Sequence, residues 1–447
     1  MFSKRLAMTG LLATACLTGG ADDWPQWLGP QRDGVWRETG IVPQLPEGGL
    51  TARWRTPVGG GYAGPAVAGG RVYLLDRRLA PGASNPSDPF QRFSIPGSER
   101  VLCLEESTGR VLWVHEYECG YTMSYPAGPR TTPLVADGRV YTLGAEGNLL
   151  CLEASDGRVV WSHDFGKDDG LKTPMWGYAG HPLLDGDRLI CLAGGEGKVA
   201  VAFDRNSGKV LWRALPAGDP GYSPPTMIEL GGRRQCVIWH SESVNGLDPA
   251  TGQVLWTFPR EINHGLSIAT PRLDGSRLFL TAFYDGPLML ELPSGPGGEP
   301  KAIWRARKRS EKDTTGIHSI IPTPFLVDGH IYGVCSYGQL RCLRADTGER
   351  LWETFAATTG KAVRWANAFL IRHEDRFFLF NERGDLILAR LSPSGYEEIG
   401  RAHLIEPTGT AAGRNVVWSH PAFADRHVFV RNDEELACFS LAAPSGP

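Results

Sequence analysis

Residues 137–161 read DGRVYTLGAEGNLLCLEASDGRVVW and predict two short β-strands followed by the start of a third. One apolar run lies at 140–143 and the next at 149–152. The Asp-Gly pairs that precede and follow these runs supply the residues that tight hairpin turns need at positive φ. The stretch ends on an aliphatic pair followed by Trp161, and this ending recurs along the chain.

The recurring tryptophans are separated by 44–51 residues and are Trp113, Trp161, Trp212, Trp256, Trp304 and Trp352. A further step of 48 residues reaches Gly400, where a seventh copy has lost its ring. An eighth hairpin at 427–441 lacks its last strand, which residues 52–55 can supply. A period of 40–50 residues made of strands and Gly-rich turns is typical of propellers. We therefore predict an all-β fold, an eight-bladed β-propeller of four-stranded antiparallel blades whose ring closes by pairing the N-terminal strand with the last blade.

This repeat resembles the pyrroloquinoline-quinone-type (PQQ-like) propeller repeat, and the resemblance covers residues 51–441. The opening WPQWLGPQRDG at 24–34 is similar to the arm that begins many exported bacterial proteins of this class. Two branches share these repeats: quinoprotein dehydrogenases and non-catalytic BamB-like propellers of the outer-membrane assembly machinery. The resemblance implies the fold and does not choose between the branches.

The chain has 447 residues, 42% of them apolar, and a formal net charge of −3 with no Lys/Arg-rich run. Such a mildly acidic surface argues against nucleic-acid binding. A closed ring is one cooperative unit, so we expect a single propeller domain and a monomer.

Residues 1–21 are typical of a bacterial export signal, with a basic start and an apolar core too short for a transmembrane span. Two fates remain open: cleavage after a small-residue site, or lipid attachment at Cys16 within a lipoprotein-like box. Both place the protein outside the cytoplasm, in the periplasm or at the periphery of the outer membrane. The predicted division continues with an N-terminal arm at 22–50, the propeller at 51–441 and a tail at 442–447.

Nine cysteines in an exported chain raise the question of disulfides. Four of them occupy repeat-equivalent strand positions a blade apart, cannot bridge one another, and are expected to be small buried side chains: Cys103, Cys151, Cys342 and Cys438. Four others can in principle pair: Cys119, Cys191, Cys236 and Cys335. No two cysteines are adjacent in the sequence.

The repeated tryptophans are interpreted as wedges between adjacent blades, as in the propellers that the chain resembles. The arm is expected to pack on the ring through Trp24, Trp27 and Trp36. Blade one carries a Pro/Ser/Gly-rich insertion at 79–99, which is either a tolerated surface loop or a lid or partner contact.

The segments that lead into each innermost strand are rich in aromatic, His and Arg residues followed by Pro. They predict one mouth of the ring as a ligand- or partner-binding funnel lined by Tyr62, Arg130, Trp176, Tyr178, Tyr222, His264, His318, Arg364, Trp365, Trp418 and His420. Aromatic rings beside hydrogen-bonding groups suit a sugar, a peptide or a planar ligand. The alternative is that these side chains plug the channel.

Neither a metal nor a cofactor is expected. The histidines in equivalent segments share no local ligand spacing. The quinoprotein branch implies adjacent cysteines, calcium and an aspartate base, and no such motif is present. We therefore predict a non-catalytic exported scaffold that binds an envelope protein, a peptide or a polysaccharide. The alternatives are a PQQ- and calcium-dependent oxidoreductase and a carbohydrate-binding module.

Overall fold

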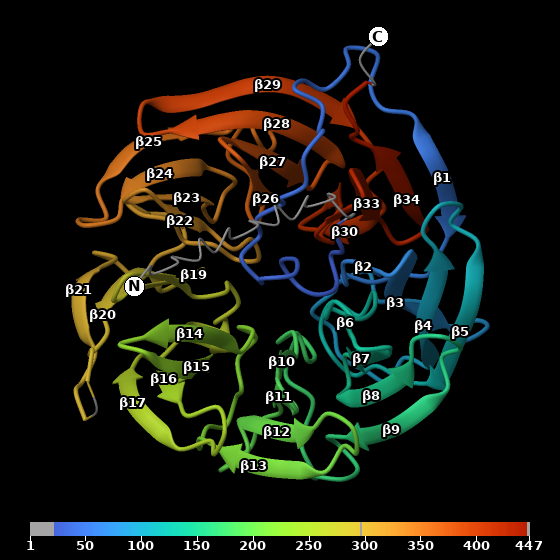
Figure 1. Cartoon of the computed structure of the whole chain (residues 1–447), viewed down its shortest axis with the longest axis horizontal. Coiled ribbons are helices and arrows are strands. Elements are labelled where there is room, and N and C mark those ends of the chain that lie inside the picture. Colours follow the sequence, from blue (N-terminus) through green and yellow to red (C-terminus); the bar gives the residue numbers. More distant parts are fainter. Residues whose placement is uncertain (1–21, 296, 445–447) are drawn as a thin grey trace, which may run out of the picture.

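The computed structural model describes residues 22–295 and 297–444. Eight four-stranded antiparallel sheets stand around one axis (Figure 1), which confirms the predicted eight-bladed propeller. The predicted export signal at 1–21, with Cys16, lies outside the described residues, as does the end of the tail at 445–447. Within the described part of the chain no helix is long and apolar enough to cross a membrane.

From the axis outward, the first four blades are β2 (Ala66–Ala68), β3 (Arg71–Leu79), β4 (Gly97–Glu105) and β5 (Val111–Glu118); β6 (Leu134–Ala136), β7 (Arg139–Leu143), β8 (Asn148–Glu153) and β9 (Val159–Asp164); β10 (Leu183–Asp185), β11 (Arg188–Leu192), β12 (Ala200–Asp204) and β13 (Val210–Ala214); and β14 (Thr226–Leu230), β15 (Arg233–Trp239), β16 (Ser243–Leu247) and β17 (Val254–Pro259). The other four are β18 (Arg272–Asp274), β19 (Arg277–Ala282), β20 (Gly286–Glu291) and β21 (Lys301–Arg305); β22 (Phe325–Val327), β23 (His330–Val334), β24 (Leu340–Arg344) and β25 (Arg350–Thr354); β26 (Ala368–His373), β27 (Arg376–Asn381), β28 (Asp385–Ser392) and β29 (Gly395–His403); and β32 (Ala422–Ala424), β33 (His427–Arg431), β34 (Glu435–Ser440) and β1 (Ala52–Pro57). A hairpin of β30 (Gly409–Ala411) and β31 (Arg414–Val416) and the 3₁₀ turn η1 (Asn263–Gly265) lie between blades.

The eighth blade takes its outermost strand from the start of the chain, as predicted. Strand β1 pairs antiparallel with β34, with Trp54 opposite Cys438 and Thr56 opposite Leu436. This pairing joins the two ends of the chain and leaves no gap between the first and last blades (Figure 1). Closure is favourable because it satisfies backbone groups that an open edge would expose.

A proline marks the entry into the innermost strand of most blades. Pro65, Pro133 and Pro182, for example, stand directly before β2, β6 and β10. The pyrrolidine ring fixes φ of the proline. Proline also has no backbone N–H, which is tolerated where a strand begins. The segments before these prolines therefore turn inward at the top of the axis.

The repeated tryptophans connect each blade to the next. Trp161 in the outer strand of one blade donates from Nε1 to the carbonyl of Arg205 in the next blade, at 2.9 Å. Gly208 of that next blade lies under the indole, so close that a Cβ there would be 2.7 Å from the ring. Tryptophans 54, 113, 212, 304 and 352 make the same kind of bond to a turn of the following blade.

Two positions depart from this rule, and the sequence explains both. The blade after Trp256 carries the degenerate copy without a Thr-Gly turn, and Trp256 donates instead to Gln235 of its own blade at 2.6 Å. At Gly400, where the ring is missing, Leu45 of the arm approaches to 3.3 Å from the place of a Cβ. The arm thus fills the site of the lost indole.

The N-terminal arm closes one end of the axis. Trp24 forms a β-bridge with Val67 of the first blade. The backbone N–H of Trp36 donates to the carbonyl of Arg372 in the seventh blade, at 2.8 Å. Between them the Arg32 guanidinium donates to the carbonyls of His181, Pro182 and Pro225 in the third and fourth blades. Burial lowers the pKa of Arg32 to about 10. The arm therefore packs on the ring through buried tryptophans, as expected. It also crosses the axis and covers one end of it.

The eight described cysteines, Cys103, Cys119, Cys151, Cys191, Cys236, Cys335, Cys342 and Cys438, are all buried and free. Burial raises the pKa of the thiols of Cys103, Cys151 and Cys342 to about 11. These thiols therefore act as small apolar side chains inside the blades.

Candidate functional site

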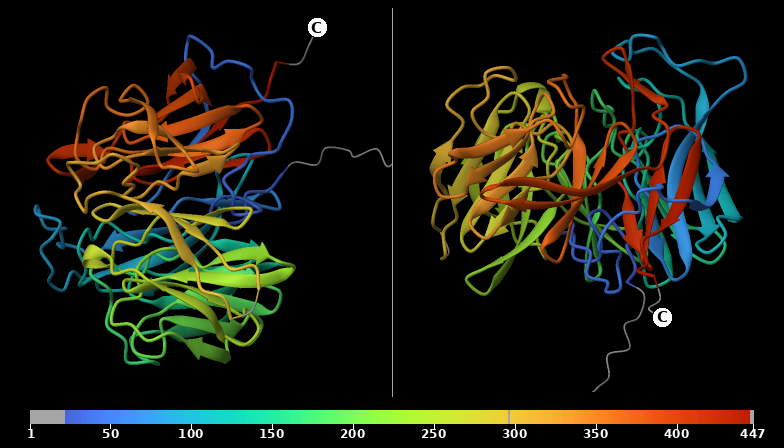
Figure 2. Two further views of the ribbon diagram at one scale, coloured as in Figure 1. Left: turned by 90° about the vertical axis from the view of Figure 1, so that its left-hand side faces the viewer. Right: turned by 90° about the horizontal axis from the view of Figure 1, so that it is seen from above.

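A cavity of about 430 Å³ opens at the end of the axis opposite the arm. In the right-hand view of Figure 2 the arm lies at the lower end of the ring, and the loop of residues 80–96 rises above the upper rim. Trp27 of the arm contributes to the cavity wall from below. The space is therefore a blind funnel with one entrance rather than a through channel.

The predicted lining is recovered in large part. The predicted residues that contact the cavity are Tyr62, Arg130, Trp176, Tyr222, His264, Trp365, Trp418 and His420. They come from different blades and meet because each stands in the segment that leads into an innermost strand. These side chains line the funnel and leave open space inside it.

Three predicted residues lie elsewhere. Tyr178 is buried in the core between two blades and packs edge-on against Phe165, with ring centroids 5.1 Å apart. His318 is 1% exposed, and its Nδ1 lies 3.2 Å from the carbonyl of Phe283. Arg364 is paired with Glu311, at 2.7 Å. All three stand in the expected segments, but they do not line the cavity.

Sequence reasoning missed more than half of the lining. The additional residues are Trp27, Phe90, Tyr125, Met175, Ala179, His181, Pro224, Leu266, Ile268, Phe283, Tyr284, Ile320, Ile321 and Phe369. Most of the apolar ones stand next to residues that were predicted. Trp27 and Phe90 come from the arm and the insertion, which carry no repeat pattern.

The floor of the funnel is a fixed group of rings. The indole of Trp27 stacks on His181 with centroids 4.0 Å apart and meets His420 edge-on at 4.4 Å. Its Nε1 donates to Thr270 Oγ1 at 3.0 Å. Thr132 joins the two histidines: its N–H donates to Nδ1 of the first at 2.9 Å, and its hydroxyl lies 2.7 Å from Nε2 of the second.

Burial sets the charge of these two histidines. It lowers the pKa of His181 well below the ordinary value and that of His420 to about 4. Both rings are therefore neutral near pH 7, and their nitrogens facing Thr132 are already committed to hydrogen bonds. The floor of the funnel is therefore uncharged near pH 7.

The mouth is aromatic, and part of it comes from the blade-one insertion. Phe90 at the tip of the insertion meets Tyr125 edge-on at 5.2 Å and Trp365 at 6.2 Å, although these residues belong to distant parts of the chain. Phe90 remains 47% exposed. The insertion thus forms one wall of the entrance.

Three residues at the mouth adopt backbone conformations that favour glycine. The φ angles are 55° at Tyr125, 56° at His264 and 64° at Trp365. Bulky residues rarely occupy this region, and each such conformation costs on the order of 1–3 kcal/mol, which the surrounding structure must offset. Strain of this kind is concentrated at functional sites.

Among the described residues of the lining, Arg130 is the only Arg, Lys, Asp or Glu. Its guanidinium lies over the ring of Tyr62, 5.2 Å from the centroid, and donates to the carbonyls of Gly128, Ser124 and Tyr125. Among the described residues no carboxylate lies within 4.0 Å of it. The positive charge is therefore held in place by backbone dipoles and is left without an acidic partner.

The remaining lining offers little catalytic chemistry. It contains no Asp, Glu, Ser, Thr, Cys or Lys among the residues that the structure describes. The Tyr222 hydroxyl is buried without a hydrogen-bond partner there, and burial raises its pKa. A calcium ion with a quinone would require carboxylates, and this lining has none, so the residues present do not fit that pair.

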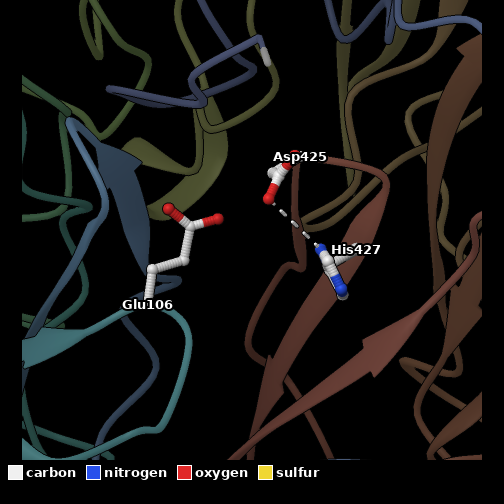
Figure 3. A group of neighbouring side chains, drawn as sticks. All are labelled: Glu106, Asp425 and His427. Carbon is white, nitrogen blue, oxygen red and sulfur yellow. Dashed lines mark ion pairs between the residues drawn. The ribbon is translucent and has the colours of Figure 1, made fainter.

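One group of potential metal ligands lies away from the funnel, at the seam between the last and first blades. Glu106, Asp425 and His427 bring their ligand atoms within 4.8 Å of one another (Figure 3). Nε2 of the histidine is 2.5 Å from the Arg53 guanidinium, so that nitrogen already has a partner. Burial, reinforced by neighbouring carboxylates, raises the pKa of Glu106 to about 7.

These features define a class: a PQQ-like eight-bladed propeller with a blind aromatic funnel. The sequence matches the family described as outer membrane protein assembly factor BamB over residues 97–295 and 240–445. The chain belongs to this family.

Individual relatives are distant. The outer membrane protein assembly factor BamB of Shewanella oneidensis is 23% identical over 266 residues, which cover 53% of this chain and 65% of that protein. The BamB structure from Moraxella catarrhalis superposes with a TM-score of 0.55 at 15% identity, covering 88% of this chain and 99% of that one. A europium-containing methanol dehydrogenase gives a TM-score of 0.58 at 12% identity, over 92% of this chain and 89% of that one. These structures share the fold with this chain.

Proposed function

We propose that this protein is a non-catalytic, exported β-propeller that acts as a protein-binding scaffold in the bacterial cell envelope, with a role in outer-membrane assembly. The observation that carries the proposal is the funnel: an open aromatic mouth whose described lining lacks any carboxylate or nucleophile–base pair. Membership of the BamB family supports an assembly role over a dehydrogenase role. The sequence features at 1–21 support export, either as a soluble protein or as a lipoprotein through Cys16.

The carbohydrate alternative is less well supported by the lining. Each sugar ring carries several hydroxyls, and burying a hydroxyl without a partner is costly. The funnel offers Arg130, His264 and tyrosine hydroxyls as its main polar groups, because the floor histidines are already bonded. An apolar side chain from a protein partner suits such walls better.

In-cell photocrosslinking tests the proposal. We would replace Phe93, which is 50% exposed on the insertion, by the photoreactive benzoyl-phenylalanine, and Leu211, 49% exposed on outer strand β13, as the matched control. Irradiation should give an adduct with an outer-membrane assembly protein at position 93 and not at 211. Identical adducts at both positions, or turnover of alcohols by the purified protein given quinone and calcium, would contradict the scaffold role.

A further inference from the structure

The funnel mouth combines an aromatic cage with one unneutralised guanidinium, and this combination selects a ligand chemistry. We propose that the mouth binds an extended segment of the partner protein through an aromatic side chain flanked by a carboxylate. The ring would enter beside Phe90, Tyr125 and Trp365, and the carboxylate would pair with Arg130. This inference deepens the proposed function and rests on it.

The preference for an aromatic side chain follows from the rings that line the mouth. Tyr125 lies at the centre of the group: its ring is 5.2 Å from Phe90, 6.5 Å from Trp365 and 6.0 Å from Trp418. Rings at such separations pack edge-to-face or offset, and an incoming ring can join them in the same way. Tyr125 and Trp365 present these rings from backbone conformations with positive φ, 55° and 64°.

The preference for a carboxylate in the ligand follows from a comparison of the guanidinium groups near the mouth. Arg364 lies 4.5 Å from the Trp365 ring centroid but is paired with Glu311. Arg414 is paired with Glu382 through two hydrogen bonds of 2.8 and 2.9 Å. Arg130 has no such partner among the described residues, and its three hydrogen bonds leave two of its five N–H groups free.

Glu99, a buried acidic side chain that interacts electrostatically with Arg130, is held by other donors. Glu99 accepts hydrogen bonds from the hydroxyls of Tyr117 and Tyr121 and from the N–H of Ala145. Burial raises the pKa of Glu99 against the opposing effect of these three hydrogen bonds, and Glu99 makes no ion pair with Arg130 among the described residues. A ligand carboxylate is therefore the partner that would complete Arg130, since guanidinium and carboxylate match in charge and in geometry.

Fluorescein-labelled capped pentapeptides test the proposal with the full chain. The probe is Gly-Asp-Phe-Asp-Gly, and its controls replace both Asp by Asn, or Phe by Ala. Fluorescence anisotropy should give at least about tenfold tighter binding for the probe than for either control, which corresponds to about 1.4 kcal/mol. Raising the salt concentration should weaken the binding of the probe and leave the binding of the Asn peptide unchanged.

Variants then assign the preference to residues. Arg130→Gln should abolish the preference for Asp over Asn, and Arg130→Lys should restore part of it. The control Arg158→Gln removes the same charge from a guanidinium 66% exposed in an outer turn, and should leave the preference intact. Phe90→Ala, on an exposed loop tip, should weaken both Phe-containing peptides. Circular-dichroism melting curves would check that each variant is folded.

The proposal is overturned if the Asp and Asn peptides bind equally, if the preference survives Arg130→Gln, or if only a free aromatic acid such as phenylacetate binds. These failures are distinct from failure of the proposed function. A crosslinked assembly protein without any peptide preference would remove this inference alone. Absence of an envelope partner together with the expected peptide preference would remove the assembly role alone.

Discussion

A pair of glycine substitutions separates the contact between blades from ordinary backbone strain. Gly208 and Gly186 both have positive φ, 72° and 56°. A Cβ at Gly208 would lie 2.7 Å from the indole of Trp161, whereas a Cβ at Gly186 would meet nothing within 4 Å. Alanine at either position lowers the free energy of unfolding by about 1–2 kcal/mol, because its backbone must adopt the left-handed conformation. Only Gly208→Ala also displaces the indole, at about 1–3 kcal/mol for overpacking.

Equilibrium unfolding in urea measures the difference directly. We expect Gly208→Ala to lose about 1–3 kcal/mol more free energy of unfolding than Gly186→Ala, because only the first disturbs a tryptophan and its bond to Arg205. The slope of the transition should be the same for both variants, since each unfolds the same surface. Equal losses within about 0.5 kcal/mol, or a larger loss at Gly186, would refute the wedge account of how neighbouring blades hold together.

Three other predictions concern the floor, the closure seam and the mouth. Trp27→Ala should lower the free energy of unfolding by about 3–5 kcal/mol and admit water beside His181, raising the depressed pKa of that histidine; an unchanged NMR titration of the ring would contradict this. Glu106→Gln should remove a loss of stability as the pH rises. The pKa of Glu106 in the folded protein, about 7, lies above its ordinary value of 4.5. Protonation of Glu106 therefore favours the folded wild type below pH 4.5, and this contribution is lost as the pH rises through 7. The urea midpoints of the two proteins should therefore shift in favour of the glutamine variant between pH 4.5 and 7.5, and a pH-independent difference would count against it. Phe93→Ala, outside the cavity lining, should change the unfolding free energy by less than about 0.5 kcal/mol, and a larger loss in melting experiments would mean that the insertion is a structural brace.

The repeat made the fold predictable because most blades use the same physical device, a tryptophan in the outer strand that bonds to the following blade. The spacing of these tryptophans marks the outer strands. The lost ring at Gly400 was also visible in the sequence. Its replacement by Leu45 was not, because the arm follows no repeat and its path depends on where the ring leaves space.

The funnel was predictable only to the level of segments. The proline before each inner strand showed which stretches turn toward the axis. It did not show the direction of each side chain, since these stretches are loops without the strict alternation of a strand. Tyr178 and His318 therefore point into the walls, whereas Trp176 lines the cavity. Phe90 reaches the mouth from an insertion whose fold no local pattern specifies.

A protein partner that enters by the aromatic mouth should protect the mouth rather than the arm or the outer strands. Hydrogen–deuterium exchange of the full chain, with and without saturating Gly-Asp-Phe-Asp-Gly peptide, measures this protection. We expect slower exchange in segments 88–93, 124–130 and 363–367, with the outer strands β5, β9 and β13 unchanged. Protection confined to those outer strands, or to the arm at 24–36, would contradict it.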